Sequence, residues 1–192
     1  ELFPYLDKGD FLDCTEIMNR YQETLYDKEA WLSPIRKSEL LLYTTIVHIG
    51  NQNYKAAKKY ISNAIVDHNI KYLPLMRTIR LVRLIAYYET QEYELIRHES
   101  RSITRSLSSP KEQTFKTERI ILWFLNKRNL PILRKDREAF WEKLSPEIQE
   151  LYNDKYENQL LRIFDFTAWM ESKIRKEKLS EVLRIHTNAK EP

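Results

Sequence analysis

The chain has 192 residues, of which 31% are charged and 12% aromatic, and its formal net charge is +4. Such a length can bury a core of its own, and so many charged and large apolar side chains indicate amphipathic helices rather than disorder. Only two glycines occur, Gly9 and Gly50. Glycine-poor chains disfavour β-hairpins and exclude glycine-rich phosphate loops.

The charge is unevenly distributed along the chain. Residues 1–31 contain eight acidic and three basic side chains, a balance of −5, so the remainder carries +9. This surplus is compatible with acidic peptides, with nucleic acid or with no charged partner. The longest apolar run, Ile120 to Leu125, is far shorter than the ~20 residues of a membrane span. We therefore expect no membrane span in this fragment.

The expected elements, in chain order, are all helices. They cover residues 10–26, 33–50, 53–67, 74–90, 92–107, 110–127 and 131–144, and Ser145-Pro146 opens another helical segment. A long last helix is expected over 154–176, followed by a short turn over 179–185. Every proline from Pro34 to Pro146 is expected at a helix start, because a proline inside a helix costs ~3 kcal/mol. Gly50 is expected to supply a left-handed C-terminal cap.

One stripe of small and apolar residues recurs at helical spacing in three segments. The copies are Phe11, Cys14, Met18, Tyr21 and Leu25; Tyr54, Ala57, Ile61 and Ala64; and Tyr93, Ile96, Ser100, Ile103 and Leu107. Equivalent positions lie 43 and 39 residues apart, the length of a helix pair in a solenoid. We predict one domain, with an incomplete unit over 1–31, helix pairs over 33–68, 71–107 and 110–144, and capping helices over 146–185.

These stripes resemble the second helix of the tetratricopeptide repeat (TPR), in which Tyr or Phe is followed by small residues three and ten positions on. Residues 40–192 are also similar to the ends of uncharacterised bacterial TPR-like proteins. Those proteins commonly close on a long helix with a motif like Phe164-Asp165-Phe166, Trp169 and Glu171-Ser172-Lys173. The resemblance implies an all-α fold, a right-handed α-solenoid of antiparallel TPR-like helix pairs closed by a long C-terminal helix. It brings no catalytic residues.

Two sets of arginines are candidate binding residues. Arg77 and Arg80 share a helix with Tyr87 and Tyr88, and in a TPR array such a helix lines the concave groove. Arginines there could hold a carboxylate or phosphate. The alternative is that they pair within the chain, with Glu89, Glu92 or the acidic N-terminal segment.

The second set is Arg97, Arg101 and Arg105, spaced as i, i+4 and i+8. Such a row could be a basic stripe for nucleic-acid phosphates. It could equally be a solvated outer face, since Glu94 and Glu99 dilute its charge.

Residues suited to catalysis or metal binding do not cluster in the sequence. The four histidines are scattered, and none forms an i, i+4 pair with another histidine or with cysteine: His48, His68, His98 and His186. We therefore expect no enzyme, no metal and no cofactor. Asp165 stands among bulky aromatics and, if buried, needs a partner such as Arg119, Arg134 or Arg137.

The favoured interpretation is a non-enzymatic protein–protein interaction scaffold that binds a peptide or helix in a concave groove. Two alternatives stay open. One is a nucleic-acid-binding or regulatory module that uses basic helical faces, and the other is a purely structural C-terminal cap of a longer array. Because the chain begins at Glu1 and holds a single cysteine, Cys14, we expect part of a longer cytoplasmic bacterial protein.

Overall fold

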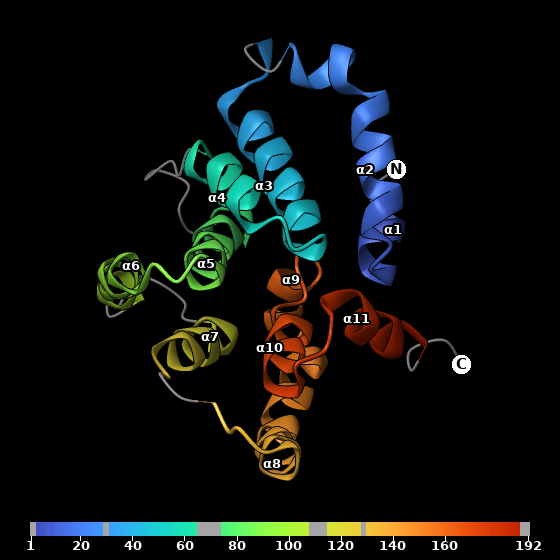
Figure 1. Ribbon diagram of the computed structural model, residues 1–192. Helices are drawn as coiled ribbons and strands as arrows, with labels where there is room; N and C mark the ends of the chain where they lie inside the picture. Colours follow the sequence, from blue (N-terminus) through green and yellow to red (C-terminus); the bar gives the residue numbers. More distant parts are fainter. Residues whose placement is uncertain (1–2, 29–30, 65–73, 108–114, 128–129, 189–192) are drawn as a thin grey trace.

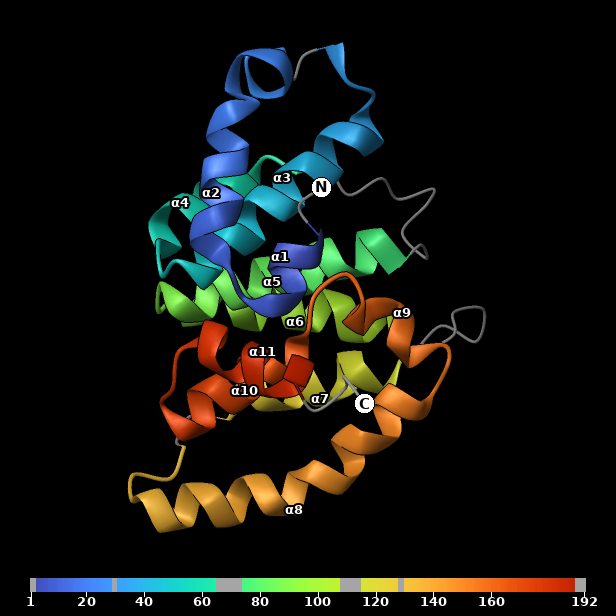
Figure 2. The ribbon, with the colours of Figure 1, turned by 90° about the vertical axis from the view of Figure 1, so that its right-hand side faces the viewer.

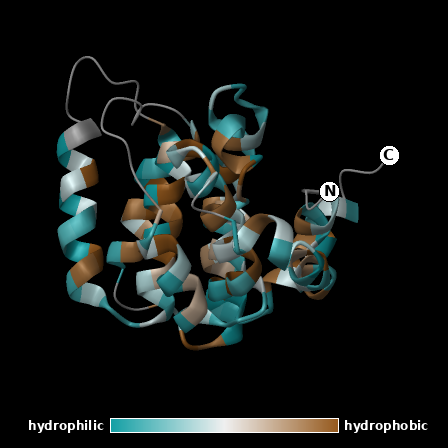
Figure 3. Cartoon of the chain, turned by 90° about the horizontal axis from the view of Figure 1, so that it is seen from above, coloured by the Kyte–Doolittle hydropathy of each residue, from teal (hydrophilic) through white to brown (hydrophobic). Residues whose placement is uncertain are grey.

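The structure is a computed structural model that describes residues 3–28, 31–64, 74–107, 115–127 and 130–188. Throughout these ranges the regular secondary structure is helical, as the sequence predicts (Figure 1). Seen from above, hydrophobic residues gather between neighbouring helices and hydrophilic residues on their outward sides (Figure 3). The buried hydrophobic residues form one core, with members from Leu6 to Leu183.

The N-terminal helices are α1 (Phe3–Lys8), α2 (Phe11–Arg20), a π-helical turn η1 (Gln22–Tyr26) and α3 (Pro34–Gly50). The start of α3 is as the sequence predicts. Ser33 is its N-cap, with Oγ accepting a hydrogen bond from the backbone N–H of Arg36, and Pro34 is its first residue.

The next helices are α4 (Tyr54–Ser62), α5 (Pro74–Glu89) and α6 (Tyr93–Leu107). α4 packs between α3 and α5, and α6 packs on α5. The repeated stripe lies at these contacts, because Ala57 and Ile61 are fully buried and Ile96 and Ile103 nearly so. α4 ends at Ser62, before the expected end at 67, and residues 65–67 lie outside the described part of the chain.

Gly50 does not have the predicted role of a left-handed cap. It is the last residue of α3, and the left-handed residue is Gln52, with φ 59°. A Cβ atom on Gly50 would lie 2.2 Å from Cγ of Phe11, so the glycine is needed for the close approach of α2 to α3. Gln91, between α5 and α6, repeats the left-handed conformation of Gln52 at the equivalent turn.

The C-terminal half contains five helices in its described residues: α7 (Lys116–Asn126), α8 (Arg134–Asn153), α9 (Glu157–Leu161), α10 (Phe166–Arg175) and α11 (Leu179–Asn188). Three expectations are wrong here. Pro146 lies inside α8 and starts no helix, the long helix over 154–176 is split into α9 and α10, and residues 179–185 belong to a helix rather than a turn.

The split has a local cause at Asp165. Its Oδ1 atom accepts a hydrogen bond from the backbone N–H of Ala168 at 2.9 Å, which makes Asp165 the N-cap of a new helix. Lys176, with φ 62°, then ends α10 in the left-handed conformation. The sequence suggests that the aromatic residues over 154–176 lie on one long helix. In the structure they are divided between α9, α10 and the residues that join them.

α10 lies at the centre of the C-terminal half, against α7, α8 and α11 (Figures 1 and 2). Trp169 of α10 is fully buried and its indole Nε1 donates a hydrogen bond to Oε1 of Glu89, at the end of α5, at 2.8 Å. Lys173 places Nζ 2.6 Å from the same carboxylate oxygen. α9 also contacts α5 and α7. The helices of the C-terminal end therefore cover one side of α5 and one side of α7.

The two ends of the described chain meet where α11 packs on α1. Thr187 donates a hydrogen bond from Oγ1 to the carbonyl oxygen of Asp7 at 2.9 Å, and Arg184 forms an ion pair with Asp10. None of the described helices has the length and apolar character that crossing a membrane requires.

Candidate functional site

Arg77 lies inside the protein. Its side chain is 5% exposed, and NH1 donates a hydrogen bond to Oε2 of Glu118 in α7 at 2.6 Å. The guanidinium also lies over the ring of Phe115, 4.9 Å from its centroid. Burial raises the pKa of Glu118, and the positive charge of Arg77 opposes that rise. A ligand that reached Arg77 would have to displace a buried carboxylate.

The other residues of that candidate groove also have partners within the chain. Arg80 of α5 forms an ion pair with Glu99 of α6, at 3.6 Å. Tyr88 packs edge-on against Trp169, with ring centroids 5.5 Å apart, and Tyr87 is half-buried against the core. The internal partners of Arg77 and Arg80 are therefore Glu118 and Glu99, instead of the Glu89 or Glu92 suggested by the sequence.

The second candidate set lies on the surface. Arg97, Arg101 and Arg105 are all exposed along α6. NH1 of Arg97 donates a hydrogen bond to Glu94 at 3.2 Å, which offsets part of the charge at one end of the row. The row is thus accessible to a ligand and to solvent alike.

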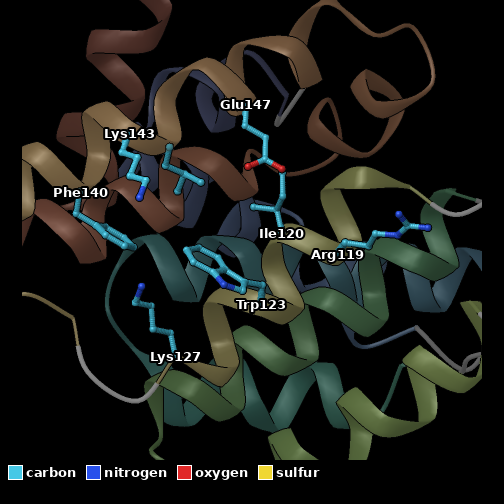
Figure 4. Close-up of a pocket in the computed structure, with 8 residues that line it drawn as sticks. Arg119, Ile120, Trp123, Lys127, Phe140, Lys143 and Glu147 are labelled. Carbon is cyan, nitrogen blue, oxygen red and sulfur yellow. The ribbon is translucent and has the colours of Figure 1, made fainter.

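A groove of about 510 Å³ lies between α7 and α8, and we call it the α7–α8 groove (Figure 4). Its lining residues are Arg119, Ile120, Trp123, Lys127, Phe140, Lys143, Leu144 and Glu147. The rings of Trp123 and Phe140 are stacked across it, with centroids 6.1 Å apart and planes inclined by 13°. Trp123 is 46% exposed, so a large part of the indole faces solvent.

Basic side chains outnumber acidic ones in the lining near these two rings. Nζ of Lys127 lies 4.3 Å from the ring centroid of Phe140 and 4.8 Å from that of Trp123. Arg119 and Lys143 are exposed on either side, and Glu147 is the one acidic residue of the lining. An aromatic floor with a basic rim matches an apolar anchor flanked by carboxylates.

A buried polar cluster joins α8, α10 and α11. The carboxylate of Asp165 accepts hydrogen bonds from the hydroxyl groups of Tyr152, at 2.8 Å, and Thr167, at 2.7 Å. Nδ1 of His186 lies 3.5 Å from Asp165, and Nε2 lies 2.7 Å from Glu171. The partners of Asp165 are therefore a histidine and two hydroxyl groups, and not Arg119, Arg134 or Arg137 as the sequence suggested.

The charges in this cluster stabilise one another. Burial alone would lower the pKa of His186, but hydrogen bonds to Asp165 and Glu171 outweigh it and raise that pKa to about 9. Burial alone would raise the pKa of Asp165, but the hydrogen bonds from His186 and the backbone N–H of Ala168 lower it. With a carboxylate on each ring nitrogen, His186 is a doubly protonated imidazolium at neutral pH, with no lone pair to accept a proton. This geometry suits a structural ion pair rather than a general base.

The α7–α8 groove is not among the candidate sites that the sequence predicts. Trp123 and Lys127 are four residues apart and share a helical face, which was a readable signal. Phe140, the second ring, lies on α8, so no local sequence pattern predicts that it stacks on Trp123. Comparison with protein-family models, with curated proteins and with solved structures finds no match to the chain.

Proposed function

We propose that the protein is a non-enzymatic protein–protein interaction scaffold that binds an acidic peptide or helix in its α7–α8 groove. The observation that carries the proposal is the stacked, solvent-accessible pair of Trp123 and Phe140, with Lys127 against both rings and Lys143 and Arg119 in the same lining. Exposed tryptophans in concave sites contribute much of the energy in protein interfaces. The basic rim would steer a partner and select its charge.

The proposed architecture is a right-handed α-solenoid of TPR-like helix pairs, with α3/α4 and α5/α6 as its regular units. Two features support it: the middle of the repeated stripe is buried in both pairs, at Ala57 and Ile61 and at Ile96 and Ile103, and Gln52 and Gln91 repeat a left-handed turn. In this proposal α9–α11 form the cap, in place of one long helix. Because these helices cover α5 and α7, the peptide site lies in the α7–α8 groove rather than along Arg77 and Arg80. The expected cytoplasmic location belongs to the same proposal.

The binding test uses fluorescein-labelled peptides and measures fluorescence anisotropy. One peptide carries a leucine flanked by aspartates and glutamates, and a second replaces every acid with lysine. We expect the acidic peptide to bind, more weakly as salt rises, and the basic peptide not to bind. Equal binding of both peptides, or no binding of the acidic peptide at low salt, would contradict the proposal.

Two pairs of variants locate the site. Trp123→Ala should weaken acidic-peptide binding at least about tenfold. Its control is Trp31→Ala, which removes another tryptophan, 89% exposed, far along the chain from the groove. Lys143→Glu should weaken binding, whereas Lys135→Glu, an exposed residue of α8 outside the lining, should not. Unchanged affinity in Trp123→Ala would place the peptide elsewhere.

A second candidate function is nucleic-acid binding, favoured by the exposed row of Arg97, Arg101 and Arg105 on α6. A mobility-shift titration at several salt concentrations separates it from peptide binding. Phosphate contacts predict a steep loss of affinity with salt and a loss in Arg101→Glu. The absence of a shift at low salt would exclude this function.

A further inference from the structure

The outward face of α2 has the chemistry that the α7–α8 groove selects. Leu12 is 76% exposed, on a helix whose other face packs in the core through Phe11 and Cys14. Asp13 and Glu16 are exposed next to it. Residues one turn apart share a helical face, so Glu16 neighbours both Leu12 and Asp13. One helix thus presents an exposed apolar anchor with two carboxylates beside it.

We propose that the α7–α8 groove is occupied by α2 of a second copy of this chain. Leu12 would pack on the stacked rings of Trp123 and Phe140, and the carboxylates of Asp13 and Glu16 would face Arg119 and Lys143. This inference rests on the proposed function, since it names the acidic helix that the groove binds. The charge balance of the whole chain agrees with it, at −5 over residues 1–31 and +9 over the rest.

The positions of the two faces decide the kind of assembly. α2 lies at one end of the molecule and α8 at the other, in both side views (Figures 1 and 2). A chain therefore cannot fill its own groove with its own α2. Each copy offers one α2 face and one groove, so the contact is heterologous, and it propagates head to tail unless a rotation closes it into a ring.

The test is sedimentation velocity over a range of protein concentrations. It compares the wild-type protein with two double variants. The head variant, Asp13→Lys with Glu16→Lys, keeps the groove. The groove variant, Trp123→Ala with Lys143→Ala, keeps α2 and gives the lysines of the head variant no acidic partner. We expect the wild-type sedimentation coefficient to rise with concentration and to fall back with salt, and each variant alone to remain a monomer. The control is Glu177→Lys, which reverses the charge of an exposed residue outside both faces. This variant should associate like the wild type.

Mixing the two variants is the decisive measurement. The intact α2 of the groove variant can enter the intact groove of the head variant, so the mixture should form a dimer that grows no further. An isologous contact between identical faces would not be restored by mixing. A wild type that stays monomeric at all concentrations overturns this inference, while peptide anisotropy still decides the proposed function. If the mixture does not dimerise although the wild type associates, another surface joins the copies and the inference is also overturned.

Discussion

The Nε2 atom of His186 in α11 lies 2.7 Å from the Oε2 atom of Glu171 in α10. On its other side the same imidazole faces Asp165, 3.5 Å away at Nδ1. Asp165 is the N-cap of α10, Glu171 lies in the middle of α10, and His186 lies on α11, which contacts α1. Their ion pairs therefore hold α11 on α10, in the position from which α11 packs on α1.

The first prediction is a dependence of stability on alkaline pH. The pKa of His186 is raised to about 9 in the folded state, from 6.5. Its contribution to the free energy of unfolding is thus fully present below pH 6.5 and is lost as pH rises towards 9. The loss should approach about 3 kcal/mol. Urea unfolding between pH 6 and pH 9 measures it. Above pH 9 the buried Cys14, with its pKa raised to about 11, adds a loss of its own.

Two variants make this prediction specific. His186→Gln should lower stability at pH 6.5 and flatten the alkaline limb, because Asp165 then lies buried without the imidazolium and Glu171 is left with Arg175. His98→Gln removes an exposed histidine and should preserve the wild-type profile. A wild-type profile that is flat between pH 6.5 and 9 would contradict the assignment of an imidazolium to His186.

The second prediction concerns the buried ion pair of Arg77 and Glu118. Glu118→Gln keeps the shape of the side chain but leaves Arg77 charged and buried, which should cost about 3–5 kcal/mol of unfolding free energy. Glu39→Gln breaks an exposed pair with Arg36 and should cost about 1 kcal/mol or less. Urea midpoints of both variants test the difference. A similar, small loss in the two would show that the interior of α5 and α7 admits water.

The third prediction tests the contact between Gly50 and Phe11. Gly50→Ala places a methyl group into the Phe11 ring, at 2.2 Å from Cγ, although alanine favours a helix. The clash should dominate and destabilise by about 1–3 kcal/mol. In Phe11→Leu the space is free, so adding Gly50→Ala there should cost much less. Additive losses in this double-mutant cycle would argue against direct contact.

The fourth prediction concerns Pro146, which lies inside α8 and is exposed. Pro146→Ala restores a backbone N–H that can donate to the carbonyl oxygen of Glu142. The variant also increases the entropy of the unfolded chain, which offsets part of this benefit. We therefore expect the free energy of unfolding to rise by about 1–2 kcal/mol. Pro34→Ala, at the first position of α3, should give no gain because that N–H has no helical acceptor. A loss of stability in Pro146→Ala would mean that the bend of α8 is required for its packing (Figure 2).

Local signals predicted most of the helices. Ser33-Pro34 and Asn53 mark helix starts because a cap satisfies backbone groups within three residues of itself. The same local reading failed at Pro146, where packing of α8 on α9 and α10 overrides the cost of a proline. It failed again at Asp165, whose capping hydrogen bond breaks a run of apolar residues that resembles one long helix.

The candidate sites were harder to predict, because their residues meet across long separations. Arg77 and Glu118 are 41 residues apart, and Asp165 finds His186 on a helix that the sequence suggested was a turn. Charge and periodicity identify which residues face outward, as they did for Arg101. They do not identify which acid a buried arginine meets, since several acids lie at comparable distances along the chain.

The hydrogen bond between Trp169 and Glu89 joins residues 80 positions apart. In a linear repeat protein each unit contacts only its neighbours, and a nascent chain can complete one unit after another. Here α5 leaves the ribosome long before α9 and α10, so the side of α5 that faces these helices stays open to water until synthesis is nearly finished. We therefore expect packing of the described helices to be completed late, and a chain that stops before Phe166 should be a substrate for chaperones rather than a shorter array.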